Sequence, residues 1–100
     1  MTTTTLPDIL IGTDTTYEPP YRILVHNDDV TPFDFVIRVL RTIFGLSPEL
    51  AEHVTWTAHV RGVALVMVRP RSEAERLVAK AHIAARLERF PLTFSIEPEG

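Results

Sequence analysis

Asn27, Asp28 and Asp29 place several oxygen acceptors next to one another on one short segment. An apolar run, Tyr21 to Val25, precedes the segment, and a stretch with helical apolar periodicity follows it. The segment is therefore predicted to be a turn between a strand and a helix, and these two elements hold it in place at both ends. Amide and carboxylate oxygens on such a segment suit a bound cation, which would be an ammonium group or a metal ion.

His59 is the second residue that could take part in binding, and it lies just after the predicted second helix. If that helix packs beside the first, its carboxyl end comes near Asn27 and Asp28. A neutral imidazole and the Asn27 amide oxygen can each accept a hydrogen bond from an ammonium group, and Asp28 supplies negative charge. Three such groups would satisfy the donors of an amino terminus removed from water.

Simpler interpretations of the same residues remain open. Asn-Asp before a helix is typical of turns in which the side chain bonds to the backbone, and a histidine at a helix end can interact with the last carbonyl groups. A metal site would use His26, Asp28, Asp29 and His59. Adjacent aspartates tend to point apart in an extended segment, and the chain has no H-x-x-x-H pair and no cysteine.

The elements that must position these residues follow from hydrophobic periodicity and from capping signals. The expected order is a strand over 21–26, a helix over 32–43, a helix over 48–57, a strand over 63–68, a helix over 72–89 and a strand over 92–96. Thr31 and Ser47 are predicted N-caps, and Ser72 with Glu75 forms a predicted capping box. The continuous apolar run over 63–68 predicts a well-buried central strand.

This order predicts an α+β fold, with a small three-stranded antiparallel sheet packed against three helices on one face (β-α-α-β-α-β). One domain is expected over 21–100, preceded by a flexible amino-terminal tail over 1–20 that is rich in threonine and ends in Pro19-Pro20. A chain of 100 residues has a modest core, so a shallow surface pocket is expected rather than a large cavity.

Charge and composition exclude several classes of function. The formal net charge of −3 comes from the first twenty residues, since ten basic residues balance ten acidic ones from Tyr21 onward. No general attraction to nucleic acid or to an anionic membrane is therefore expected. The first residues lack the features of a secretion signal, so we expect a cytoplasmic protein, with a monomer as the default. No nucleophile elbow or phosphate-binding glycine loop is present, which argues against an enzyme and against a cofactor.

The motifs Asn27-Asp28-Asp29-Val30-Thr31-Pro32 and His59-Val60-Arg61-Gly62, with Pro91-Leu92 before the last strand, resemble those of the ClpS family. Members of this family are adaptors that deliver N-degron proteins, which are recognised by their first residue, to a AAA+ protease. The resemblance covers about Pro20 to Pro98 and implies the α+β fold already predicted.

The resemblance also implies roles for individual residues. Asn27, Asp28 and His59 would hold the free α-amino group of a substrate's first residue. A pocket behind them would take the large hydrophobic side chain of that residue, and the matching family positions that line it are Thr31, Val36, Val39 and Leu92. The implied partners are amino-terminal peptides and a ClpA- or ClpC-type unfoldase with ClpP.

The chain departs from the family pattern in the predicted pocket. Phe33 stands where the family usually has a methionine that acts as a gate, and Thr55 and Ala58 stand where methionine and valine are typical. Smaller, more polar walls and a stiffer gate predict a changed preference among Leu, Phe, Tyr and Trp as first residues.

The predicted docking surface departs from the family pattern as well. Ser72 and Leu77 replace the acidic and basic residues usual at the unfoldase contact, although Glu75 remains. Two other functions stay open. The altered pocket residues Phe33, Thr55 and Ala58 motivate a docking module that modulates a Clp unfoldase without binding N-degrons. The other is a small metal-dependent enzyme.

Overall fold

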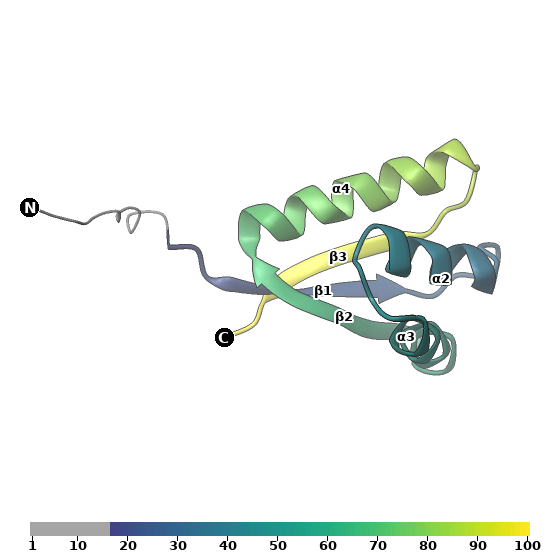
Figure 1. The fold of residues 1–100 in the computed structure, drawn as a ribbon, viewed down its shortest axis with the longest axis horizontal. Helices are drawn as coiled ribbons and strands as arrows, with labels where there is room; N and C mark the ends of the chain where they lie inside the picture. Colours follow the sequence, from purple (N-terminus) through teal and green to yellow (C-terminus); the bar gives the residue numbers. More distant parts are fainter. Residues whose placement is uncertain (1–16) are drawn as a thin grey trace, which may run out of the picture.

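The computed structural model describes residues 17–100 and contains three strands and three helices in the predicted order (Figure 1). Of the predicted tail, residues 1–16 lie outside the described residues. The elements are β1 (Pro20–His26), α2 (Phe33–Thr42), α3 (Pro48–Arg61), β2 (Val63–Pro70), α4 (Arg71–Leu87) and β3 (Thr93–Pro98).

The three strands form one antiparallel sheet in the order β2-β1-β3, so β1 is the central strand. The prediction of a central strand over 63–68 is therefore wrong, because β2 lies at an edge. Ala64 and Val66 are buried, whereas Val63 and Leu65 are 38% and 48% exposed. An unbroken apolar run predicts burial on both faces, but in β2 only one face is covered.

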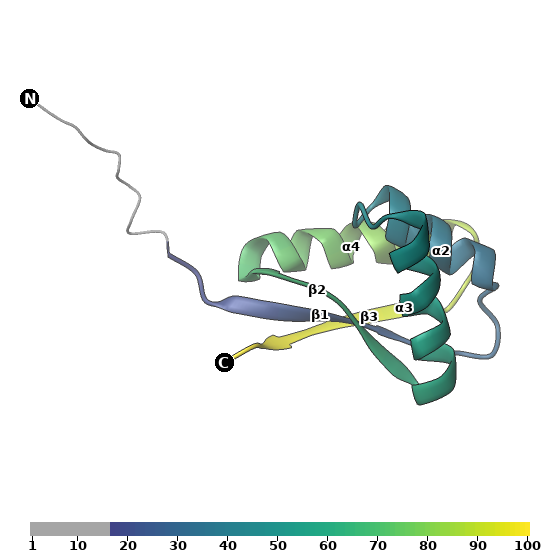
Figure 2. The same ribbon diagram turned by 60° about the horizontal axis from the view of Figure 1, so that its bottom comes forward.

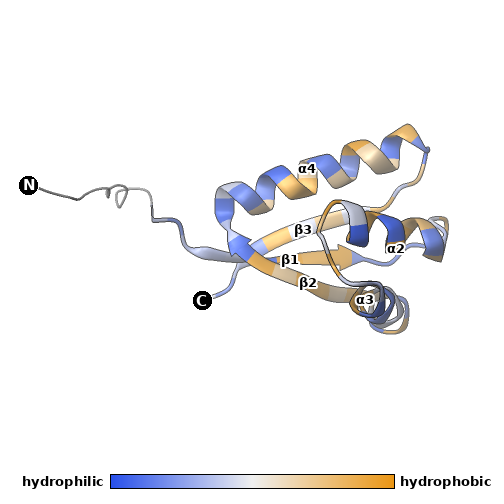
Figure 3. Cartoon of the chain, viewed as in Figure 1, coloured by the Kyte–Doolittle hydropathy of each residue, from blue (hydrophilic) through white to orange (hydrophobic). Residues whose placement is uncertain are grey.

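The helices cover one face of this sheet, and α4 runs along it (Figure 2). Ile23 and Val25 of β1 and Phe94 of β3 point into the core and are at most 5% exposed. On the open face, Arg22 of β1 forms an ion pair with Glu97 of β3. Apolar residues run along the strands, and in α2 and α4 they alternate with hydrophilic ones (Figure 3). The three helices and the antiparallel three-stranded sheet confirm the α+β arrangement.

Two of the three predicted helix caps differ in the structure. Ser47 caps α3 as predicted, since its side chain accepts a hydrogen bond from the Leu50 N–H at 3.2 Å. Thr31 is not the cap of α2, because that helix begins at Phe33 and its N-cap is Pro32, which has no capping side chain. The Thr31 hydroxyl donates to Asp28 instead.

The predicted capping box of α4 is also wrong. Pro70 is the N-cap of α4 and makes no side-chain bond, and Ser72 donates both its N–H and its hydroxyl to Glu18. At the end of α3, Gly62 adopts the left-handed conformation (φ 90°) that favours glycine. Because α3 extends to Arg61, His59 lies in its last turn rather than after the helix as predicted.

Candidate functional site

The segment after β1 and the carboxyl end of α3 lie at the end of the sheet where β1 stops and β2 begins (Figure 1). The Asn27 N–H donates to the Gly62 carbonyl at 2.9 Å, and His26 pairs with Val63 in the sheet. These contacts join the segment after β1 to the end of α3. They bring Asn27 and His59 to the same part of the molecule, although 32 positions separate them in the sequence (59 − 27).

The Asp28 carboxylate holds the turn that leads into α2. Its Oδ1 accepts the N–H groups of Val30 and Thr31 at 2.8 and 2.7 Å, and its Oδ2 accepts the Thr31 hydroxyl at 2.8 Å. The simpler interpretation of Asp28, a side chain that bonds to the turn, therefore describes its contacts. Its negative charge remains available to a nearby cation, because each carboxylate oxygen can accept more than one hydrogen bond.

The same contacts set the protonation state of Asp28. Partial burial raises the pKa of this carboxyl, but the N–H groups of Thr31 and Val30 and the Thr31 hydroxyl outweigh that effect, and the positive charge of Arg86 adds to theirs. The net pKa lies below the ordinary value of 3.8, so Asp28 is ionised near neutral pH. Asp29, which is exposed, follows directly in the chain.

A small hollow opens beside this turn. Its lining residues come from β1, the turn, α2, α3 and the segment before β3, and they are Val25, His26, Asn27, Asp28, Thr31, Phe33, Val36, Thr55, Ala58 and Leu92. The deep wall is apolar, since Val25, Val36 and Ala58 are buried core residues. Asn27 and Asp28 supply polar groups. The cavity volume is about 20 Å³, which is room for about one water molecule.

Leu92 reaches this wall because the chain between α4 and β3 is tied back to α4. The Arg86 guanidinium donates to the carbonyl groups of Phe90 and Leu92 at 2.7 and 2.9 Å. Thr55 is 3% exposed, and its hydroxyl donates to the Ala51 carbonyl of its own helix at 2.8 Å. That hydroxyl is therefore satisfied without a ligand, and the wall at Thr55 is less polar than the residue type indicates.

Three aromatic rings pack together beside the hollow. The Phe33 ring lies edge-to-face with Trp56 at 5.0 Å between centroids and with His59 at 4.9 Å. Trp56 and His59 are also edge-to-face, at 5.7 Å. Trp56 was not expected from the sequence to lie near the site. Its spacing of three residues before His59 on one helix face is the signal that points to it.

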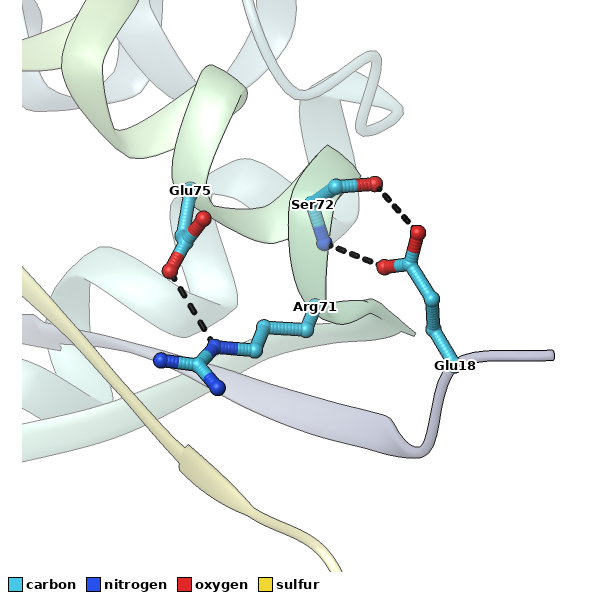
Figure 4. A network of polar contacts seen from close by, with 4 residues as sticks. All are labelled: Glu18, Arg71, Ser72 and Glu75. Carbon is cyan, nitrogen blue, oxygen red and sulfur yellow. Dashed lines mark hydrogen bonds and ion pairs between the residues drawn. The ribbon is translucent and has the colours of Figure 1, made fainter. Parts of the chain in front are cut away.

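Of the remaining predicted residues, Val39, His59 and Glu75 do not line the hollow. His59 is next to it through its contact with the Phe33 ring. Val39 is 3% exposed in the core and does not line the hollow. Glu75 lies in the first turns of α4, toward the opposite end of the sheet, where it pairs with Arg71 at 3.2 Å (Figures 1 and 4). The pocket role of Val39 and the docking role of Glu75 stay predictions.

The four residues weighed for a metal site have other contacts. His26 Nε2 bonds to the Ser95 hydroxyl at 2.7 Å, Asp28 holds its turn, and His59 packs on aromatic rings. Within residues 17–100, no three His, Cys, Asp or Glu side chains are grouped so that they could hold a metal ion. Over the same residues, no helix has the length and apolar character needed to cross a membrane.

This arrangement favours a ligand with a cationic head and an apolar side chain. Asn27 and His59 are exposed, and Asp28, which follows Asn27 in the chain, supplies negative charge. An ammonium group has three donors and a positive charge, which these groups can match. An apolar group attached next to the ammonium would face the wall formed by Val36, Ala58 and Leu92.

Comparisons with known proteins show which family the chain resembles. The family model described as "ATP-dependent Clp protease adaptor protein ClpS" matches residues 16–95. ClpS 2 of Mesorhizobium japonicum is 38% identical over 96 residues, which cover 96% of this chain and 95% of that protein. ClpS of Desulfotalea psychrophila is 41% identical over 85 residues, covering 84% and 83% of the two chains. Among solved structures, Agrobacterium tumefaciens ClpS2 bound to L-phenylalaninamide has a TM-score of 0.80 at 37% identity and covers 83% of this chain and 100% of its own.

Proposed function

Because the chain belongs to the ClpS family of ATP-dependent Clp protease adaptor proteins, we propose that it recognises N-degrons. It binds the free amino-terminal residue of a substrate protein, where that residue has a large hydrophobic side chain. It then delivers the substrate to a AAA+ Clp protease. The proposed action is binding and delivery, without a chemical step by this chain, in the cytoplasm.

The observation that carries this proposal is an apolar hollow with polar groups at its opening. Asn27 and Asp28 line the same hollow as Val36, Ala58 and Leu92. The ligand of the similar A. tumefaciens structure, L-phenylalaninamide, has a free amino group beside an aromatic side chain, as the first residue of a protein does. The polar groups of this site suit the amino group of such a ligand, and its apolar wall suits the side chain.

Each polar residue has a proposed role. Asn27 accepts one ammonium hydrogen through its amide oxygen, and His59 accepts another through a ring nitrogen. Asp28 holds the turn and contributes negative charge, which favours the protonated amine.

The apolar half of the site contributes about as much binding free energy as one hydrogen bond to the amino group. Burying a Leu or Phe side chain gives on the order of 1.5–3 kcal/mol. Hydrogen bonds to a charged group add about 1.5–3 kcal/mol each before the costs of association are subtracted. The sum favours a weak to moderate affinity, with little contact beyond the first two residues of the substrate.

The docking half of the proposal concerns α4. Glu75 is exposed on this helix and lies away from the hollow, so one molecule can hold a substrate and a ring at once. The ring is an unfoldase of the ClpA or ClpC type working with ClpP. Exchange of Glu75 for lysine should abolish retention of the protein by such a ring in a pull-down, while the affinity for peptides is unchanged.

Fluorescence anisotropy with short labelled peptides tests the substrate half. Peptides that begin with Leu, Phe, Tyr or Trp should bind, and the same peptides with an acetylated amino group should not. Asn27→Ala and His59→Ala should each abolish binding. His53→Ala is the matched control, because His53 is exposed on the same helix but is not part of the ring cluster of Phe33, Trp56 and His59. Equal binding of acetylated and free peptides would overturn the proposal.

The narrow hollow favours one alternative function, a module that docks to a Clp unfoldase without binding N-degrons. A cavity of about 20 Å³ does not admit a leucine side chain as it stands. This alternative predicts that the ring retains the protein although no free-amine peptide binds. The anisotropy and pull-down experiments together separate the two functions.

A further inference from the structure

The hollow must widen before it can take a large side chain, and its lining shows which residue has to move. Val25, Val36, Thr55, Ala58 and Leu92 are core residues, each at most 8% exposed. Their displacement would disrupt the packing of the domain. The mobile part must therefore lie at the surface side of the hollow.

The polar lining residues at that side are restrained by hydrogen bonds. Asp28 and Thr31 bind each other, His26 binds Ser95, and the Asn27 backbone binds Gly62. Phe33 is different, because its half-buried side chain cannot form such hydrogen bonds and packs edge-to-face on the rings of Trp56 and His59. A rotation of the Phe33 side chain is thus the simplest movement that enlarges the hollow.

Trp56 is one of the two rings that pack edge-to-face on Phe33. The planes of the two rings are 87° apart with centroids at 5.0 Å, a favourable edge-to-face geometry. Trp56 does not line the hollow and is 52% exposed, so neither the core nor the pocket wall accounts for a tryptophan at this position. His59 contacts both rings and completes the cluster.

We propose that Trp56 is a positioning residue that holds Phe33 over the hollow and so sets how readily a first residue enters. The inference rests on the proposed function of the same site. Trp56 acts through Phe33 rather than by contact with the buried side chain. Apparent affinity equals intrinsic affinity multiplied by the fraction of molecules with Phe33 displaced, so a stronger contact with Trp56 means weaker binding.

The experiment compares Trp56→Leu, Trp56→Phe and the wild type in the full chain, using free-amine peptides that begin with Leu or Phe. Trp56→Leu removes the aromatic edge and should tighten binding by about 2- to 10-fold, the effect of one aromatic pair on the closed population. Trp56→Phe retains an aromatic contact and should bind like the wild type. Leu50→Ala is the control, because Leu50 is exposed on α3 and does not line the hollow.

The same substitution made in the Phe33→Ala variant separates this role of Trp56 from a direct contact with the peptide. In Phe33→Ala there is no ring to hold, so adding Trp56→Leu should change affinity by less than about 2-fold, as expected for a residue that acts only through its partner. Trp56 is the only tryptophan in the chain, so its fluorescence should also change when a peptide without tryptophan binds. Thermal unfolding establishes that each variant is folded.

The outcomes distinguish this inference from the proposed function. Tighter binding in Trp56→Leu that disappears in the Phe33→Ala background supports the inference. Unchanged or weaker binding in Trp56→Leu, or the same change in both backgrounds, overturns it while leaving the proposed function intact. If neither the wild type nor Phe33→Ala nor Trp56→Leu binds any free-amine peptide, the proposed function fails, and this role of Trp56 fails with it.

Discussion

The carboxylate of Glu18 accepts two hydrogen bonds from Ser72, a residue 54 positions later in the chain (Figure 4). The Ser72 N–H donates at 2.7 Å and the Ser72 hydroxyl at 2.9 Å. Since Pro70 has no side chain that can cap α4, a residue before β1 supplies the acceptor that the first turn of the helix lacks. The segment before the sheet is thus joined to the helix that carries Glu75.

Exchange of Glu18 for alanine should therefore loosen the first turn of α4. The N–H groups of residues 72–74 should exchange faster with solvent water, and the melting temperature should fall slightly. The Ser72 N–H, then its hydroxyl, hold the pKa of Glu18 below 4.5, and the charge of Arg71 assists them. The stabilising effect is thus present above pH 4.5 and is lost as the pH falls through the lowered pKa.

Glu52→Ala is a matched control for this prediction, because Glu52 is an exposed glutamate in the interior of another helix, α3. Hydrogen exchange followed by NMR gives the effect residue by residue. Unchanged protection of the Ser72 N–H in Glu18→Ala would show that water replaces the carboxylate without loss.

Asp28 should have two separable effects, on the turn and on the ligand. Asp28→Ala removes the acceptors for Val30 and Thr31 and should lower the free energy of unfolding by about 1–2 kcal/mol. Asp28→Asn keeps an oxygen that can accept both N–H groups, so its effect on stability should be smaller. It removes the negative charge, however, and should weaken the binding of free-amine peptides. Urea unfolding and peptide anisotropy measure the two effects.

Asp29→Asn makes the same change of charge at the next position and serves as the comparison. Asp29 is exposed and does not line the hollow, so the loss of its charge should affect affinity less. If both asparagine variants weaken binding equally, Asp28 contributes only through the overall negative potential of the surface, as Asp29 does.

Local sequence patterns predicted the existence and order of all six elements, because apolar periodicity reflects which face of each element is buried. They failed where another acceptor competes, either within the same turn or from far away in the chain. Thr31 and Ser72 have the types and spacings of helix caps, but Asp28 and Glu18 take their hydroxyl groups as donors. A local motif carries no information about an acceptor 54 residues away.

Some features of the site could be predicted from the sequence, and others could not. The short distance between the Asn27 segment and the end of α3 follows from the order of the elements, and the structure brings Asn27 and His59 to one end of the sheet. The contact of Trp56 with Phe33 depends on how α2 and α3 pack, which neither helix encodes alone. The edge position of β2 depends on strand order, which the apolar content of a strand does not determine.

His82 should make stability depend on pH in the neutral to mildly acid range. Its Nε2 accepts the Phe94 N–H at 2.9 Å, a bond that requires the unprotonated nitrogen. Burial lowers the pKa of His82 below 6.5, and the positive charge of Arg86 lowers it further. The unfolded chain therefore binds a proton more readily than the folded one, and stability declines as the pH falls below about 6.5.

Chemical denaturation at several pH values between 8 and 5 measures this decline. His82→Gln retains an oxygen acceptor for Phe94 and does not titrate, so its stability should vary less over the same range. His53→Gln removes an exposed histidine and should retain the wild-type slope. An identical slope in His82→Gln would assign the pH dependence to other groups.

Thr55 should contribute its methyl group rather than its hydroxyl to the wall of the hollow. The hydroxyl is engaged by the Ala51 carbonyl of the same helix, which also accepts the helical N–H. Thr55→Val keeps the methyl group and should change the free energy of unfolding by less than about 1 kcal/mol. The affinity for peptides that begin with Leu or Phe should stay within about 2-fold.

Thr55→Ser makes the opposite exchange, since it keeps the hydroxyl and removes the methyl group. It should weaken binding by roughly 2- to 10-fold, as expected when one methyl contact is lost from an apolar wall. Anisotropy measurements on the two variants with the same peptides give the comparison directly. The reverse order, with Val weaker than Ser, would mean that the hydroxyl leaves Ala51 and binds the ligand. In that case Tyr should be preferred over Phe as the first residue, because a buried hydroxyl then gains a partner.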